Sequence, residues 1–205
     1  MKRVFDVAVA SAGLVLASPL LLVATIAIKA GSPGPAVYRG VRVGRGGRTF
    51  HILKLRTMRV GADTRGPALT HAADPRVTGV GRFLRRTKFD EVPQLLNVIR
   101  GDMSLVGPRP EHPDFVEHYT EEQRRVLSVR PGITGPSSLA FMREDEMLTG
   151  ADPVAQYVTS IMPKKLALDL DYIRTATFGG DLKILGLTVL RVLGLSRRDW
   201  RARSQ

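Results

Sequence analysis

The chain has 205 residues, which fits one domain better than two, and 43% of them are hydrophobic, enough for a core. It contains no cysteine, so disulfides, thiolate metal sites and a cysteine nucleophile are excluded. Its 31 lysines and arginines outnumber its 19 acids, and the formal charge of +12 attracts nucleic acid, anionic lipid or phosphate-rich substrates. Composition does not choose among these partners.

The N-terminus carries an uncharged, apolar segment at 7–28. As a straight helix of about 22 residues it would be roughly 33 Å long, enough for a ~30 Å hydrocarbon core. Pro19 lies near its midpoint and cannot donate the helical hydrogen bond to Val15, which divides the segment into two arms that are each about half a bilayer deep. Ser18 could bond a carbonyl that the proline frees. These lengths fit a re-entrant hairpin broken at Ser18 and Pro19.

Basic residues flank this segment on both sides. Lys2 and Arg3 precede it, and a second basic group follows it: Lys29, Arg39, Arg42, Arg45 and Arg48. A spanning helix would place one group on the wrong side under the positive-inside rule, whereas a re-entrant hairpin keeps both groups in the cytoplasm. Because the leading group is short, the violation is small, and a proline-kinked spanning helix stays open beside the hairpin.

The rest of the chain predicts a mixed, helix-rich α/β domain. A Gly/Pro linker at 31–35 precedes two β-rich runs, 36–43 and 48–55, which a glycine turn joins into a β-hairpin. The other predicted elements are a polar loop at 59–79, a basic helix at 82–87, a helix at 92–100 ended by Gly101, a rigid loop at 104–110, and helices at 113–129, 163–175 and 181–200.

The last predicted helix is amphipathic and basic. It places Leu182, Leu185 and Val189 among its apolar positions, and it carries several basic residues and an aromatic one: Lys183, Arg191, Arg197, Arg198 and Trp200. Such a composition suits a helix that lies on a membrane surface. Packing against the protein core is the other interpretation, and the sequence leaves both open.

The residues that carry chemistry are concentrated at 85–110. Pro93 falls where a helix begins, so Asp90 lies near the N-cap and Glu91 in the first turn. The plain interpretation is helix capping by these acids. The functional interpretation uses the same geometry, because an ionised Asp90 could attack phosphorus and form an acyl phosphate.

Such an attack on an anionic diphosphate needs positive charge. A divalent metal would bridge phosphate oxygens, and arginine forks match phosphate geometry. The candidates are close in sequence or on the preceding hairpin: Lys54, Arg56, Arg85, Arg86 and Arg109. The components of phosphoryl transfer are therefore all present.

The chain resembles the bacterial sugar transferase family, the polyprenyl-phosphate phosphoglycosyl transferases, over nearly its whole length. The motifs that carry the resemblance are Lys2-Arg3-Val-Phe5-Asp6, Ser18-Pro19, Lys54-Leu-Arg-Thr-Met58, Asp90-Glu91-Val-Pro93-Gln94-Leu95, the run Gly101-Asp-Met-Ser-Leu-Val-Gly-Pro-Arg-Pro110, and Pro131-Gly-Ile-Thr-Gly135. Several long motifs in the right order make this signal specific.

The resemblance implies a monotopic protein of the bacterial inner membrane. Residues 1–30 would form the re-entrant membrane helix, and 31–205 the catalytic domain on the cytoplasmic face. The implied reaction moves a sugar-1-phosphate from a UDP-sugar to a polyprenyl (undecaprenyl) phosphate and releases UMP. It would begin glycoconjugate or exopolysaccharide assembly.

The resemblance also implies roles for individual residues. Asp90 would be the nucleophile, and Glu91 with Asp90 would bind Mg²⁺. The remaining implied residues bind phosphate or substrate: Lys54, Arg56, Arg85, Arg109 and Asp169. The acceptor phosphate would then attack the Asp90 adduct.

One stretch departs from the family pattern. After Gly135 many members have L-x-Q-V-x-G-R, whereas this chain has 136–143, in which Arg143 is the candidate for the family arginine. The sugar therefore stays undetermined. So does the oligomeric state, for which a dimer is possible.

Three other functions compete with this one. A nucleic-acid-binding protein fits the charge, but the apolar N-terminus and the scarcity of aromatic residues among basic ones disfavour it. A UDP-releasing glycosyltransferase would use Asp169-Leu-Asp171 as a D-x-D metal motif, although three residues make a weak signal. A non-catalytic membrane scaffold of the same fold is the third.

Overall fold

The computed structural model describes residues 1–62, 69, 74–144, 147–148 and 152–195 of the chain. Its helices are α1 (Lys2–Gly31), α2 (Gly79–Arg86), α3 (Gln94–Arg100), α4 (Pro113–Glu117), α5 (Pro136–Ala140), α6 (Pro153–Gln156), α7 (Met162–Thr175) and α8 (Phe178–Val192). Short turns of other helical types are η1 (Arg45–Gly47), η3 (Phe89–Glu91), η4 (Gln123–Ser128) and η6 (Tyr157–Ile161). The strands are β1 (Val37–Val43), β2 (Thr49–Leu55), β3 (Ser104–Val106) and β4 (Gly132–Thr134).

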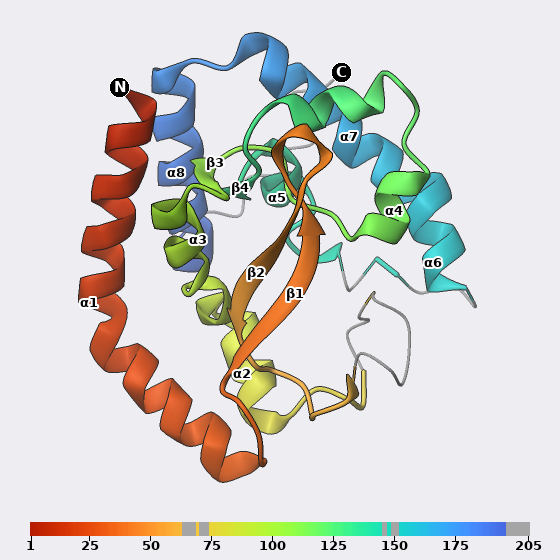
Figure 1. The fold of residues 1–205 in the computed structure, drawn as a ribbon. Coiled ribbons are helices and arrows are strands. Elements are labelled where there is room, and N and C mark those ends of the chain that lie inside the picture. The colour runs from red at the N-terminus through yellow and green to blue at the C-terminus, as the bar shows by residue number, and fades with distance from the viewer. Residues whose placement is uncertain (63–68, 70–73, 145–146, 149–151, 196–205) are drawn as a thin grey trace.

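The predicted helix-rich α/β fold is confirmed. Figure 1 shows the β1–β2 hairpin in the middle of the molecule, with α1, α3 and α8 on one side and α4, α6 and α7 on the other. The strands pair antiparallel from Val37↔Leu55 to Val43↔Thr49, as predicted. The turn η1 between them contains Gly46 and Gly47 at φ 70° and 75°, a backbone conformation that glycine adopts without steric cost.

The segment 104–110, predicted as a rigid loop, begins with a strand. β3 pairs with β4 in parallel, Ser104 opposite Gly132 and Val106 opposite Thr134. Gly132 lies so close to its neighbour that an added Cβ would come 2.1 Å from the backbone nitrogen of Gly107. A three-residue strand whose partner is distant in sequence leaves no local pattern to detect.

The predicted helix at 113–129 is wrong in its middle. α4 ends at Glu117, and the 3-10 turn η4 follows at Gln123–Ser128. Between them Thr120 and Gln123 bond reciprocally: the Thr120 N–H donates to Gln123 Oε1 at 2.9 Å, and the Gln123 N–H donates to Thr120 Oγ1 at 3.2 Å. This is a capping box, which starts a new helical turn.

The predicted helix at 163–175 is confirmed as α7, and that at 82–87 as α2, which begins at Gly79. α8 begins at Phe178 rather than Asp181, because Thr177 Oγ1 accepts from the Gly180 N–H and caps the helix there. Of the predicted basic face, Arg197, Arg198 and Trp200 lie outside the described residues.

Helix α1 is one continuous element rather than two separate arms. Pro19 lies within it, and Figure 1 shows the helix changing direction about half-way along. Ser18 Oγ donates to the Val15 carbonyl at 2.7 Å, the acceptor that Pro19 leaves without its helical donor. The helix is long and apolar enough to cross a membrane by length and composition. A bend is thus present, whereas the re-entrant hairpin itself is not confirmed.

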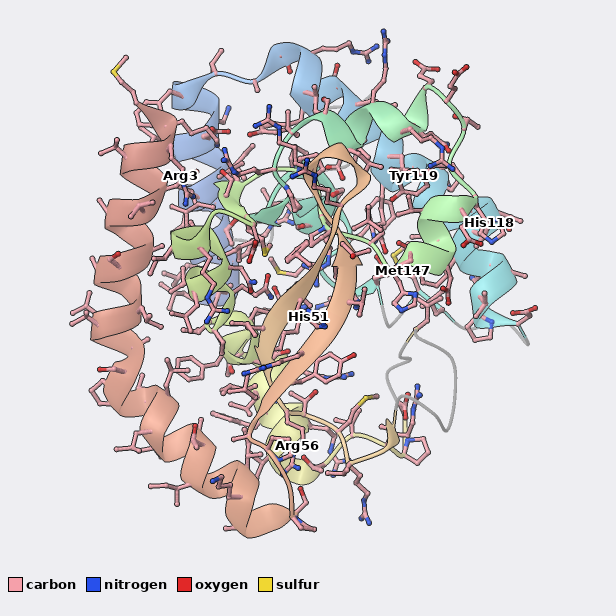
Figure 2. All side chains as sticks on the ribbon, viewed as in Figure 1. Arg3, His51, Arg56, His118, Tyr119 and Met147 are labelled. Atoms are coloured by element: carbon pink, nitrogen blue, oxygen red, sulfur yellow. The ribbon has the colours of Figure 1, made fainter. Side chains whose placement is uncertain are left out.

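Both ends of α1 are attached to the same folded body. Near the N-terminus, Lys2 Nζ pairs with the carboxylate of Asp181 on α8, and an Arg3 guanidinium N–H donates to the Ile99 carbonyl at 3.2 Å. Figure 2 shows Arg3 between α1 and the body. Asp6 is buried and accepts from Ser104 Oγ at 2.7 Å. The Lys2-Arg3-x-x-Asp6 motif therefore fastens the helix to α3, β3 and α8.

Arg56 makes the corresponding attachment at the other end. Its guanidinium donates to the carbonyls of Pro33 at 2.6 Å and Ser32 at 2.8 Å, just beyond α1. Figure 2 shows Arg56 at the end of the hairpin nearest the C-terminal end of α1. Arg56 therefore anchors the C-terminal end of α1, and its role in phosphate binding stays a prediction.

Candidate active site

The turn η3 carries the two acids at 90 and 91. Asp90 was expected to cap the helix that follows, but Pro93 occupies the N-cap of α3, and no side-chain capping bond forms there. The capping interpretation is therefore wrong: η3 inserts a separate turn ahead of α3. Asp90 is 6% exposed, and its Oδ1 atom has no hydrogen-bond partner among the described residues. A buried, unpartnered carboxylate oxygen costs about 1–3 kcal/mol or more, and a catalytic role or a bound ion is one explanation for it.

Glu91 is held by two cations that arrive from different segments. Lys54 Nζ, from β2, and Arg109 Nη2, from the loop after β3, each lie 2.8 Å from Glu91 Oε1. Three of the residues singled out by the sequence thus meet at one carboxylate. The side chain of Glu91 is 14% exposed, so these charges interact with little screening by solvent.

Asn97 on α3 fixes this meeting point and was missed by sequence analysis. Its side chain accepts from the Leu53 N–H at 3.0 Å and donates to the His51 carbonyl at 2.8 Å. Both bonds go to the β2 backbone immediately before Lys54. Asn97 is fully buried. Its two bonds link α3 to β2, and they therefore set the distance between β2 and the segment that carries Glu91.

The electrostatic environment separates the two acids. Burial raises the pKa of Asp90, and the charge of Glu91 adds to this, while Lys54, Lys88 and Arg85 oppose it. Burial alone would raise the pKa of Glu91 too, but Arg109 and Lys54 outweigh it and hold that pKa well below its ordinary value. Glu91 is therefore ionised, whereas nearby cations stabilise the negative charge of Asp90 less well.

Arg85 and Asp169 lie around this centre with different partners. Arg85 Nε donates to Thr57 Oγ1 at 2.9 Å, and its charge acts on Asp90. Asp169 on α7 is 3% exposed and accepts from Ser137 Oγ at 2.8 Å. Burial raises the pKa of Asp169 to about 7, even though the Ser137 hydroxyl and Lys165 lower it.

The D-x-D interpretation of 169–171 does not fit this arrangement. Asp171 is exposed on the same helix, where its carboxylate lies 3.6 Å from the guanidinium of Arg174. Residues two apart on a helix do not face each other, and here one acid points inward and the other into solvent. The two carboxylates therefore do not converge on a shared metal.

Arg143 is exposed, on a turn that follows α5. Its neighbours tie that turn to the site: Lys88 Nζ donates to the Met142 carbonyl at 3.2 Å, and Glu144 pairs with Lys165 at 2.7 Å.

A second ionic cluster, also missed, lies behind Arg109. Lys165 on α7 is 5% exposed and pairs with Glu111 at 3.0 Å as well as with Glu144. Tyr157 donates its hydroxyl to Glu111 and accepts from Lys165 Nζ at 2.8 Å. Glu111 and Glu144 raise the pKa of Lys165 beyond what burial takes away. The cluster joins the Arg109 segment to the turn that contacts Lys88.

A family model described as bacterial sugar transferase matches residues 1–195. The chain belongs to the bacterial sugar transferase family. The Asp90–Glu91 pair, Lys54 and Arg109 all lie inside the matched region, so the site just described is built from the part of the chain that defines the family.

Named relatives agree with this membership. This bacterial sugar transferase is 45% identical over 195 residues to the UDP-glucose:undecaprenyl-phosphate glucose-1-phosphate transferase of Caulobacter vibrioides, covering 94% of this chain and 69% of the relative. It is 37% identical over 194 residues to the Escherichia coli protein of the same name, covering 93% of this chain and 40% of the relative. A UDP-N-acetylgalactosamine-undecaprenyl-phosphate N-acetylgalactosaminephosphotransferase of Aeromonas hydrophila is 42% identical over 140 residues, 66% of this chain and 33% of the relative.

Proposed function

We propose that this chain transfers a sugar-1-phosphate from a UDP-sugar to undecaprenyl phosphate and releases UMP, through a covalent intermediate on Asp90. The observation that carries the proposal is the unpartnered, buried Oδ1 of Asp90 beside a Glu91 that two cations hold. The names of the relatives support the substrate classes. Because they include both glucose and N-acetylgalactosamine transferases, the sugar is left open.

The reaction consists of two displacements at one phosphorus atom. An Asp90 oxygen attacks the phosphorus that bears the sugar, the bond to the bridging oxygen breaks, and UMP leaves with that electron pair. An oxygen of the acceptor phosphate then attacks the same phosphorus, and the bond to Asp90 breaks. The product is a diphosphate-linked sugar, Asp90 regains its carboxylate, and no net proton is consumed.

The residues fit a Mg²⁺ ion, which the family resemblance implies. Mg²⁺ binds through one or two carboxylates together with substrate phosphates, and Asp90 Oδ1 is a buried carboxylate oxygen without a partner among the described residues. Those residues contain no group of three His, Cys, Asp or Glu that could hold a metal by themselves. Asp90 and Glu91 would therefore hold the ion together with the donor diphosphate, and the ion would neutralise charge on its oxygens.

We further propose that the protein is monotopic, with its catalytic body on the cytoplasmic face. Both ends of α1 are bonded to the same body. Lys2 and Arg3 make these bonds at the N-terminal end, and Arg56 of the body bonds the segment just after the C-terminal end. These contacts support both ends lying on one side of the membrane. Between them α1 leaves a row of large apolar side chains exposed: Val15, Leu16, Leu20, Leu22, Val23 and Ile26.

Helix α8 extends this apolar surface. The rings of Phe5 and Phe178 meet edge to face with centroids 5.2 Å apart, which places the start of α8 against α1. α8 exposes Leu182, Val189 and Leu193 on the side away from its buried Ile184. These faces support contact of both helices with lipid. The phosphate of a polyprenyl carrier lies at the headgroup level of the same bilayer.

Nucleotide release tests the reaction class. Detergent-solubilised protein with Mg²⁺, undecaprenyl phosphate and a panel of UDP-sugars should release UMP with at least one donor, because the proposed attack is at the phosphorus that bears the sugar. UMP and UDP are separated by chromatography. Release of UDP would instead indicate a glycosyltransferase, and no release with any donor would favour a non-catalytic scaffold.

Replacement of Pro19 by Ala tests the bend in α1. The alanine would restore an N–H donor to the Val15 carbonyl and remove the ring clash, so α1 should straighten and pull its N-terminus away from α8. An N-terminal tag, labelled from each side of sealed vesicles, should become partly reachable from the side opposite the catalytic body. Ser18→Ala is the matched control, since it removes the 2.7 Å bond to Val15 and keeps the proline. A tag that stays on the original side in Pro19→Ala would show that the proline does not set the topology.

A further inference from the structure

Lys88 has a backbone conformation that its residue type disfavours. Its φ is 56°, and within the described ranges it is the one residue other than glycine with a positive φ. For a non-glycine residue this left-handed conformation is unfavourable, and such residues are concentrated at functional sites. Glycine or asparagine would satisfy the turn before η3 at lower cost. The backbone alone thus gives no reason for a lysine at this position.

The side chain of Lys88 is half-buried, and its charge is poorly compensated. Its Nζ atom donates to the carbonyl of Met142 at 3.2 Å, the one partner recorded for it among the described residues, and that acceptor is neutral. By contrast, Lys54 and Arg109 are both paired with Glu91, and Lys165 is paired with two carboxylates. Among the described residues, Lys88 therefore forms no salt bridge with a carboxylate, unlike Lys54, Arg109 and Lys165.

The position of Lys88 indicates which anion would pair with it. Lys88 lies two residues before Asp90, and its charge acts on the Asp90 carboxyl group. A phosphoryl group attacked by Asp90 must come within bonding distance of that carboxylate, and thus into the field of the Lys88 ammonium. The Met142 carbonyl at 3.2 Å is a neutral acceptor, whereas a phosphate oxygen carries negative charge, so the ammonium binds phosphate more strongly.

We propose that Lys88 is a phosphate-binding residue of the transferase, whose ammonium leaves the Met142 carbonyl to bind a non-bridging oxygen of the phosphoryl group that Asp90 accepts. This role rests on the proposed function. It adds a cation on the nucleophile's own turn to those on β2 and after β3. Because Met142 neighbours Arg143, the exchange also releases a contact of the turn where this chain departs from the family pattern.

Three substitutions separate charge from backbone and from hydrogen bonding. Lys88→Asn suits the left-handed backbone and removes the charge, Lys88→Gln keeps an N–H donor of similar reach, and Lys88→Arg keeps the charge. Lys164→Gln, on an exposed position of α7, controls for the loss of one positive charge from the chain. Each protein is assayed for UMP release and, separately, for the Kd of UDP with Mg²⁺ by calorimetry.

We expect Lys88→Asn and Lys88→Gln to lose about 10²-fold in kcat/KM, as for removal of one donor to developing charge, and to bind UDP about tenfold more weakly. Lys88→Arg should recover most of both, Lys164→Gln should match the wild type, and the Tm of Lys88→Asn should not fall. Wild-type UDP affinity in Lys88→Asn would overturn the proposal. The UDP measurement decides this even if no donor gives UMP, which would overturn the proposed reaction alone. A wild-type protein that does not bind UDP would overturn both.

Discussion

Replacement of Asp90 by Asn should abolish UMP release, with a loss of at least about 10³-fold, while the fold stays intact. An amide of the same shape cannot form an acyl phosphate, and removal of a covalent nucleophile costs this much or more. With donor labelled in the sugar-bearing phosphate and no acceptor, the wild type should retain label that hydroxylamine removes. The variant should retain none.

The same variant should be as stable as the wild type or more stable. Burial raises the pKa of Asp90 above its unfolded value, so the folded state favours the protonated form. Stability is therefore lost as pH rises through that window, and near neutral pH the ionised carboxylate costs free energy that a neutral amide would not. Urea unfolding at about pH 5 and about pH 8 should show a smaller difference between the two pH values for Asp90→Asn than for the wild type.

Controls make this result specific to position 90. Asp114→Asn removes an acid whose side chain is 75% exposed on α4 and should keep wild-type turnover. Asp90→Ala excludes activity regained by deamidation of the introduced asparagine. Retention of hydroxylamine-sensitive label in Asp90→Ala would show that another residue is the nucleophile.

The parts of the fold that the sequence predicted are those with local patterns. The β1–β2 hairpin has alternating β-branched residues around a glycine turn, and α7 has a helical apolar period. In the site, residue type made Lys54 and Arg109 candidates for phosphate binding, and the family resemblance made Glu91 a candidate metal ligand. In the structure, Lys54 Nζ and Arg109 Nη2 each lie 2.8 Å from Glu91 Oε1.

The parts that were missed divide into two kinds. The break between α4 and η4 had a local signal, the Thr120-x-x-Gln123 capping box, which went unused. The pairing of β3 with β4 and the role of Asn97 had none, since their partners are distant in sequence and the contacts are to backbone. The anchoring contacts of Arg56 were missed for the same reason, because its partners are carbonyl groups, which carry no sequence signature.

Lys165 is the clearest case of a residue that only the tertiary structure identifies, and replacing it should cause the largest loss of stability. Lys165→Met removes the cation between Glu111 and Glu144, whose side chains are 15% and 24% exposed. Two largely buried carboxylates would then lose the cation that pairs with both, and the Coulombic attraction of Arg42 and Arg109 would remain to act on Glu111. Breaking a buried pair in this way costs about 3–5 kcal/mol of unfolding free energy, measurable by urea denaturation.

A matched control exists on the same helix. Arg174 pairs with Asp171 near the end of α7, but both side chains are 67% exposed, so Arg174→Ala should cost less than about 0.5 kcal/mol. Combining Lys165→Met with Glu111→Gln and Glu144→Gln should recover a large part of the loss, because the neutral amides need no counter-ion. A Lys165→Met protein within about 1 kcal/mol of the wild type would contradict the buried-pair account.

Lys165→Met should also weaken catalysis, although Lys165 does not contact the substrate. Glu111 lies two residues after Arg109, and Glu144 lies two residues after the Met142 carbonyl that Lys88 contacts. Lys165 thereby holds together the segment that binds Glu91 and the turn that binds Lys88, on either side of Asp90. In Lys165→Met, kcat/KM should fall while Lys165→Arg, which keeps the cation, retains more of it. The segments on either side of Asp90 and Glu91 are thus held by the ionic cluster around Lys165, which does not contact the substrate. For this reason the site depends on α7, although the nucleophile is on η3.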